Sequence, residues 1–117
     1  MSTNLGTRIH ALRKERGLTQ RELAEEAGID FTYLSKIENS ALPYSPSAKT
    51  LKKLASVLKV DELEFLRLAD KLPTELGAIT HTEEGIRFLR KASKVVGPDD
   101  WQDLMAFLEQ KRKERKK

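Results

Sequence analysis

The stretch TQRELAEEAGIDFTYLSKIEN, residues 19–39, contains the signals of two short helices joined by a tight turn. Thr19 can cap the first helix, and Glu22, three residues later, completes a capping box. Gly28 falls where that helix must end in a left-handed conformation, which glycine adopts without steric penalty. Asp30 can then cap the second helix. The stretch therefore predicts two helices that meet at Gly28.

The two predicted helices have distinct inward and outward faces. Small and apolar residues form the inward faces, Leu23, Ala24 and Ala27 on the first helix and Leu34 and Ile37 on the second. The outward residues of the second helix are a short, mixed and mostly uncharged set, namely Phe31, Thr32, Tyr33, Ser35 and Lys36. Such a set suits the reading of base edges, where hydrogen bonds and apolar contacts tell base pairs apart.

Five positions of this stretch, Gln20, Ala24, Gly28, Leu34 and Ile37, fit a known pattern. The segment resembles the helix-turn-helix of phage Cro and lambda-type repressors, the Xre-like family of bacterial transcription regulators. In that pattern Ala24 is small because the second helix crosses close above it, while Leu34 and Ile37 seat the reading helix on the core. The resemblance implies a sequence-specific DNA-binding transcription regulator, a dimeric repressor that places residues 30–39 in the major groove of double-stranded DNA.

The resemblance also implies roles for individual side chains. Base-edge contacts fall to Phe31, Thr32 and Lys36, and phosphate contacts fall to Thr19, Gln20, Tyr33, Asn39 and Ser40. Lys36 can donate to guanine, Thr32 can donate or accept, and Phe31 offers apolar contact, for example to a thymine methyl. Family geometry pairs Arg13 with Glu38 in an ion pair, which we interpret as structural first, with a phosphate contact by Arg13 as a secondary role.

Composition limits the classes of function. The chain has 117 residues, a net charge of +4 and no cysteine, which predicts one domain, or a small domain with an appendage, without disulfides. Residues 1–59 carry ten Lys or Arg against six Asp or Glu, residues 60–110 carry six against eleven, and the last seven, KRKERKK, are strongly basic. This distribution suits a protein that binds an anion with one face and a partner with another. Because no apolar run resembles a signal peptide or a membrane span, we expect a cytoplasmic protein with no membrane contact.

The apolar periodicity predicts an all-α fold, with five helices followed by a C-terminal helical hairpin. The five helices resemble the full DNA-binding domain of the lambda-repressor family. The first helix is expected over about residues 4–16, Ser47 is expected to cap the fourth, and Asp61 with Glu64 to form a capping box at the fifth. Pro73 and Gly77 are interpreted as helix breakers. We therefore expect a DNA-binding domain over residues 1–70, a linker over 71–81, and an oligomerisation or interaction hairpin over 82–117.

The predicted hairpin carries more apolar surface than two helices can bury against each other. Gly97-Pro98 breaks it, and its apolar residues are Ile86, Leu89, Trp101, Leu104, Met105 and Leu108. The architecture resembles the SinR-like branch of the family, in which such a hairpin oligomerises and binds an antagonist. We expect a homodimer or tetramer, and folding of the apolar face onto the chain's own first domain stays open. The alternative function is an antitoxin or adaptor that binds a protein partner, an antagonist or toxin, and autoregulates by DNA binding.

The remaining candidates for chemistry have plain explanations. His10 and His81 lie far apart without a second ligand at metal-binding spacing, so we expect surface residues and no metal site. Asp99, Asp100 and Asp103 fall in the first turn of a helix, where the helix dipole favours acids. The basic tail is interpreted as a solvated helix end, with a non-specific phosphate contact as the alternative. No catalytic constellation or phosphate loop is visible, so we expect neither an enzyme nor a cofactor.

Overall fold

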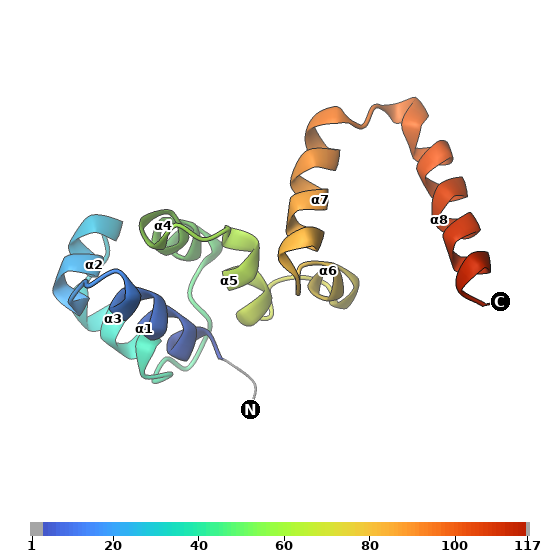
Figure 1. Cartoon of the computed structure of the whole chain (residues 1–117). Helices are drawn as coiled ribbons and strands as arrows, with labels where there is room; N and C mark the ends of the chain where they lie inside the picture. The colour runs from blue at the N-terminus through green and yellow to red at the C-terminus, as the bar shows by residue number, and fades with distance from the viewer. Residues whose placement is uncertain (1–3, 117) are drawn as a thin grey trace. The chain divides into compact units, whose positions relative to one another are not determined.

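The computed structural model describes residues 4–116, and all regular structure within them is helical (Figure 1). In chain order the helices are α1 (Leu5–Glu15), α2 (Gln20–Ala27), α3 (Phe31–Glu38), α4 (Ala48–Leu58), α5 (Glu62–Leu68), α6 (Thr74–Ile79), α7 (Glu83–Val95), the 3-10 turn η1 (Pro98–Asp100) and α8 (Trp101–Arg115). The chain divides into two compact units, one ending at Ile86 and the other beginning at Arg87. The predicted all-α fold is confirmed.

One apolar core holds α1 to α5 together. Helix α3 contacts α1 and α2, while α4 contacts α2 and α5. All five helices contribute buried apolar side chains: Leu5, Ile9, Leu12, Leu23, Ala24, Ala27, Leu34, Ile37, Leu51, Leu54, Ala55, Leu58 and Phe65. The spacing of three and four residues predicts these faces, because such residues line one side of a helix.

Side-chain caps define the starts of α2 and α3, and a glycine defines the end of α2. The Thr19 hydroxyl accepts from the Glu22 N–H at 3.1 Å, and the Glu22 carboxylate accepts from the Thr19 N–H at 2.9 Å. Gly28 ends α2 in the left-handed conformation with φ 69°. Asp30 caps α3 by accepting from two N–H groups of its first turn. The local signals in residues 19–39 therefore form the turn that they predict.

Helix α5 is joined to α1 by an ion pair at its first turn. Asp61 caps α5 by accepting from the Leu63 N–H at 2.9 Å. The second half of the predicted capping box is wrong, because the Glu64 carboxylate lies 3.1 Å from Arg8 Nη2 of α1. A guanidinium binds a carboxylate more strongly than one backbone N–H does, so the tertiary contact overrides the local one.

Gly6 allows α1 to approach the end of α3 closely. A Cβ atom at this position would lie 2.5 Å from the Ile37 carbonyl oxygen and 2.6 Å from that of Glu38. Both oxygens belong to the backbone at the C-terminal end of α3. A side chain at Gly6 would therefore displace the whole end of that helix, because a packed interior leaves little room to yield.

The variant Gly6→Ala is expected to lower the free energy of unfolding by about 1–3 kcal/mol, although alanine favours helices over glycine. Urea unfolding followed by circular dichroism measures this change. Gly77→Ala is the matched control, because the nearest atom to its added Cβ is Arg67 Cγ at 4.0 Å. That control is expected to be neutral or stabilising by up to about 1 kcal/mol. Equal behaviour of the two variants would contradict the close approach at Gly6.

The segment expected to be a linker contains a helix. Helix α6 begins directly after Pro73, which lies between α5 and α6 as a breaker does, but Gly77 lies inside α6, so the interpretation of Gly77 as a breaker is wrong. Proline is tolerated at the start of a helix because the N–H that it lacks has no acceptor there. A single glycine inside a helix costs only about 1 kcal/mol relative to alanine. Thr80, 2% exposed, closes α6 by donating from Oγ1 to the Leu76 carbonyl oxygen at 2.8 Å.

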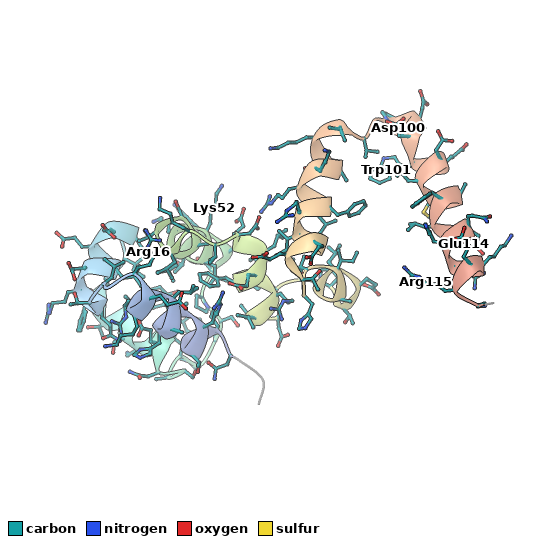
Figure 2. All side chains as sticks on the ribbon, in the orientation of Figure 1. Arg16, Lys52, Asp100, Trp101, Glu114 and Arg115 are labelled. Carbon is teal, nitrogen blue, oxygen red and sulfur yellow. The ribbon has the colours of Figure 1, made fainter. Side chains whose placement is uncertain are left out.

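The second unit contains the rest of α7, then η1 and α8. The chain breaks at Gly97-Pro98 as predicted, and the Gly97 N–H donates to Asp100 Oδ2 at 2.8 Å. Three of the apolar side chains expected to oligomerise are more than half exposed, Trp101 at the start of α8 (Figure 2), Met105 and Leu108, whereas Ile86, Leu89 and Leu104 are partly buried. Within residues 4–116, no helix has both the length and the apolar character needed to cross a membrane. The same residues contain no group of three or more His, Asp or Glu side chains able to hold a metal ion.

Candidate nucleic-acid interface

Helix α3 rests on α2 through small and apolar side chains. Ala24 of α2 is buried, and Leu34 and Ile37 of α3 are buried beside it. The turn between the helices is closed by a hydrogen bond of 2.9 Å from the Ile29 N–H to the Ala24 carbonyl oxygen. This packing fixes α3 by one side and leaves its other side available to a ligand.

The free side of α3 presents two exposed side chains of the kind that reads bases. Thr32 and Lys36 are exposed and lie four residues apart, so they share one face of the helix. Their hydroxyl and ammonium groups can donate to acceptors at base edges. Phe31, the third residue predicted to read bases, is partly buried and packs against the core. The Arg21 guanidinium lies over its ring, with Cζ 4.4 Å from the ring centroid.

The end of α3 carries the second group of predicted phosphate contacts. Asn39 and Ser40 are exposed, and Asn39 Nδ2 donates to Ser35 Oγ at 3.4 Å. Ser40 adopts a left-handed backbone with φ 54°, which turns the chain into the loop toward α4. Tyr33 is partly buried against the core. Asn39 and Ser40 are therefore accessible, whereas Tyr33 offers only part of its side chain.

The start of α2 leaves backbone donors free. The capping box engages the N–H groups of Thr19 and Glu22, so those of Gln20 and Arg21 have no acceptor within the helix. Hydrogen bonds from the backbone and side chain of Thr19 lower the pKa of Glu22 and keep this capping carboxylate ionised. The Gln20 amide is already engaged, because Nε2 donates to Glu38 Oε1 at 3.2 Å. A phosphate contact by Gln20 therefore uses its backbone N–H or its second amide hydrogen.

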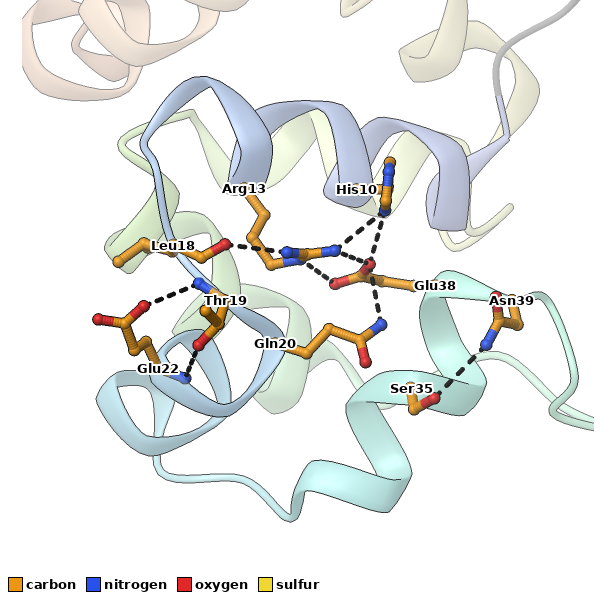
Figure 3. Close-up of polar contacts among 9 residues, drawn as sticks. All are labelled: His10, Arg13, Leu18, Thr19, Gln20, Glu22, Ser35, Glu38 and Asn39. Carbon is orange, nitrogen blue, oxygen red and sulfur yellow. Dashed lines mark hydrogen bonds and ion pairs between the residues drawn. The ribbon is translucent and has the colours of Figure 1, made fainter.

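Glu38 lies at the centre of a hydrogen-bonded network that joins α1, α2 and α3 (Figure 3). Arg13 binds it through two nitrogens, with Nε 2.8 Å from Oε2 and Nη2 3.0 Å from Oε1. Arg13 Nη1 also donates to the Leu18 carbonyl oxygen at 2.9 Å. The side chains of Arg13 and Glu38 are 7% and 2% exposed. The ion pair expected from the family geometry is thus present and buried.

The surroundings of Glu38 keep it charged. Burial raises the pKa of Glu38, but hydrogen bonds from Arg13, Gln20 and His10, together with the charge of Arg13, outweigh burial and bring this pKa below its usual value. Because all three guanidinium nitrogens of Arg13 are engaged in these contacts, the arrangement fits the interpretation of Arg13 as structural first.

Two features of the site were outside the sequence-based expectations. The His10 side chain is about half exposed, yet its Nδ1 lies 3.1 Å from both Glu38 Oε1 and Arg13 Nη2. His10 and Arg13 are three residues apart and therefore lie on one face of α1. This spacing is the sequence signal from which their contact could have been predicted. The contact between Arg21 and Phe31 has no such signal, because the two residues belong to different helices.

Comparisons with known proteins agree with this geometry. Residues 9–65 match the helix-turn-helix family model. The ImmF control region 10 kDa protein of Bacillus phage phi105 is 41% identical over 73 residues, 62% of this chain and 78% of that protein. The helix-turn-helix-type transcriptional regulator SinR of Bacillus licheniformis is 42% identical over 67 residues, 57% of this chain and 60% of that protein, and y4dJ of Sinorhizobium fredii, of the same type, is 35% identical over 69 residues, 59% of this chain and 87% of that protein.

Two solved structures are also similar. The crystal structure of SinR, master regulator for biofilm formation, in complex with DNA has 42% identity and a TM-score of 0.50, and the match covers 53% of this chain and 97% of that one. The complex of the SinR and SinI proteins has 28% identity and a TM-score of 0.52, and the match covers 93% of this chain and 98% of that one.

The fold of α1 to α5 and the free face of α3 define a helix-turn-helix DNA-binding protein. The chain belongs to the Xre-like family of helix-turn-helix transcription regulators. Members of this family are DNA-binding regulators and not enzymes. The DNA-binding regulator expected from residues 19–39 is therefore confirmed, and so is the expectation, drawn from the whole sequence, that the protein is not an enzyme.

Proposed function

We propose that the protein represses transcription by placing α3 in the major groove of double-stranded DNA. The observation that carries this proposal is the exposed pair Thr32 and Lys36, one turn apart on a helix that Leu34 and Ile37 anchor from behind. The major groove admits an α-helix, and its base edges present the acceptors that these side chains can reach. The similarity to SinR, solved in complex with DNA, supports the same use of the helix. Such a role places the protein in the cytoplasm, where bacterial DNA lies.

The proposed contacts divide into reading and positioning sets. Thr32 and Lys36 read base edges, and the ring edge of Phe31 is the apolar surface available to a thymine methyl. Phosphate contacts, which fix register without carrying sequence information, are assigned to Thr19, Gln20, Tyr33, Asn39 and Ser40. The exposure of Asn39 and Ser40 and the free N–H groups at the start of α2 support this assignment.

We further propose that the C-terminal hairpin pairs two or four copies of the chain. Three reading side chains specify few base pairs, and proteins of this kind read two half-sites about one helical turn apart. Trp101, Met105 and Leu108 are large apolar side chains with exposed fractions of 51%, 65% and 59%, and such exposure favours an interaction surface. Covering of the same side chains by the chain's own first unit is the alternative, and it predicts a monomer in solution.

A second candidate function is capture of a protein antagonist or toxin by the hairpin. The match to the SinR–SinI complex covers 93% of this chain, which supports a protein partner in addition to DNA. The chain would then serve as an antitoxin or adaptor that autoregulates by binding DNA. Analytical ultracentrifugation tests self-association: a dimer or tetramer of the purified protein supports it. A monomer contradicts self-association, and is expected both when the first unit covers the apolar face and when the hairpin binds a protein partner.

The variant Lys36→Ala is expected to weaken binding to the preferred DNA site by about 1–3 kcal/mol and to relax the preference at one or two base positions. The physical reason is that the ammonium group donates to a base edge, and the shortened side chain cannot. Fluorescence anisotropy on the preferred site, on its single-base variants and on random DNA measures both effects.

Lys53→Ala is the matched control for Lys36→Ala, because it removes the same exposed group from α4 and leaves the reading helix intact. It is expected to leave the base preference unchanged. If Lys36→Ala weakens binding equally on preferred and random DNA, Lys36 contacts a phosphate and the base-reading role is wrong.

A further inference from the structure

The contact between Arg21 and Phe31 links the two helices of the helix-turn-helix. Arg21 is the second residue of α2 and Phe31 the first of α3. The guanidinium carbon lies 4.4 Å from the ring centroid, within the range of a cation–π interaction. The ring is itself held, because Phe31 packs against the apolar core. A rigid aromatic surface therefore supports a long side chain that would otherwise be free to move.

A basic hollow surrounds this contact. It has a volume of about 660 Å³, and its lining includes Lys14, Thr19, Gln20, Arg21 and Phe31 but no carboxylate. Within residues 4–116, neither Lys14 nor Arg21 takes part in an ion pair. The hollow therefore carries positive charge that the described part of the chain leaves unneutralised, which favours an anion.

Arg13 also lines the hollow, but its charge is already engaged. Its guanidinium binds the Glu38 carboxylate and the Leu18 carbonyl oxygen. Lys14 and Arg21 are thus the cations of this hollow that remain available to a ligand. Of the two, only Arg21 is held by an aromatic ring, and only a guanidinium has the planar donors that stack on a ring and still bind phosphate.

We propose that Arg21 contacts a phosphate of the DNA backbone and that Phe31 is the positioning residue that holds its guanidinium in place. This inference rests on the proposed function, because it requires the helix-turn-helix to lie on DNA. Phe31 then has a role beyond contact with a thymine methyl. Its ring reduces the conformational freedom that Arg21 loses on binding, which strengthens binding to every sequence alike.

The variants Arg21→Gln and Phe31→Leu test the proposal in the full-length protein. Arg21→Gln is expected to weaken binding to preferred and random DNA by the same factor. The slope of log affinity against log salt becomes shallower by about 0.9, since one phosphate contact is lost. Between 50 and 200 mM salt, its affinity falls about 3.5-fold less than that of the wild type. Arg87→Gln, the same change at an exposed residue of α7, is the control and keeps the wild-type slope.

Phe31→Leu keeps an apolar side chain for a thymine methyl but removes the flat ring. In the wild-type background, this variant is expected to weaken binding to preferred and random DNA by the same factor. In the Arg21→Gln background, it is expected to weaken binding by less than about twofold. Arg21→Lys retains the charge without the planar group, so it is expected to keep the wild-type salt slope and to lose most of the dependence on Phe31. Thermal unfolding of each variant shows whether the fold is intact.

Two results overturn the proposal. One is an Arg21→Gln variant with the affinity and salt slope of the wild type. The other is a Phe31→Leu variant that alters base preference and whose effect simply adds to that of Arg21→Gln, since Phe31 would then act as a base reader alone. Failure of the proposed function gives a different result, namely a wild-type protein that prefers no DNA sequence.

Discussion

Replacing Glu38 with alanine is expected to lower the free energy of unfolding by about 3–5 kcal/mol. The variant leaves the Arg13 guanidinium, 7% exposed, without its carboxylate. It also removes the acceptor that Gln20 and His10 share. An unpaired buried charge costs more than the pair contributes, which is why the loss of one partner has so large an effect. Urea unfolding at neutral pH measures the loss.

The loss of stability caused by Glu38→Ala is expected to become smaller at acidic pH. Because its contacts outweigh burial and lower the pKa of Glu38 in the folded protein, the ionised carboxylate stabilises the fold fully above about pH 4.5, the usual value. That stabilisation is lost as the pH falls further, through the lowered pKa. The difference in stability between wild type and Glu38→Ala therefore narrows below about pH 4.5.

Glu25→Ala is the control, since Glu25 is an exposed acid on α2 and surface changes of this kind stay within about 0.5 kcal/mol. Glu38 would not be the buried centre of the network if Glu38→Ala lowered the free energy of unfolding by less than about 1 kcal/mol. The same conclusion would follow if the difference in stability between wild type and Glu38→Ala did not narrow below about pH 4.5.

Removal of the hairpin is expected to weaken binding to DNA with two half-sites by about 10²–10⁴-fold, because the second domain no longer binds at a high effective concentration. A chain ending at residue 81 keeps α1 to α6 and the whole apolar core. It is expected to fold and to sediment as a monomer. Binding to DNA with a single half-site is expected to change little, which makes that DNA the internal control.

A second variant tests the surface without shortening the chain. Trp101→Ser combined with Leu108→Ser keeps α7 and α8 but removes two of the exposed apolar side chains. It is expected to dissociate the oligomer and to reproduce the DNA-binding loss of the shortened chain. Tight binding of the shortened chain to two half-sites would rule out pairing through the hairpin.

The elements that the sequence predicts correctly depend on contacts between near neighbours in the chain. The capping box of Thr19 and Glu22, the left-handed Gly28 and the Asp30 cap involve residues within a few positions of one another. Helix α6 was not predicted, because its sequence lacks such local signals. Its six residues are too few to show the helical period of apolar residues. They follow Pro73 and include Gly77. A short helix of this kind has no local signal to distinguish it from a loop.

The details of the site that the sequence does not predict depend on tertiary contacts. The Glu64 carboxylate of α5 binds Arg8 of α1 in a partly exposed ion pair, although the local pattern favours a capping box. Arg21 meets Phe31 only because α2 packs against α3, since the two residues belong to different helices. The family pattern places Arg13 beside Glu38, but their burial and the addition of His10 follow only from the packing of α1 against α3.

Sequence-specific reading of DNA by α3 can be tested by selecting the fragments that the full-length protein binds from random DNA at a stated salt concentration. We expect enrichment of two copies of one short motif, with centres about 10 base pairs apart, so that two α3 helices enter successive major grooves. The Lys36→Ala protein, selected in parallel, is expected to lose preference at one or two positions of each copy. Recovery of fragments with no common motif would contradict sequence-specific reading by α3.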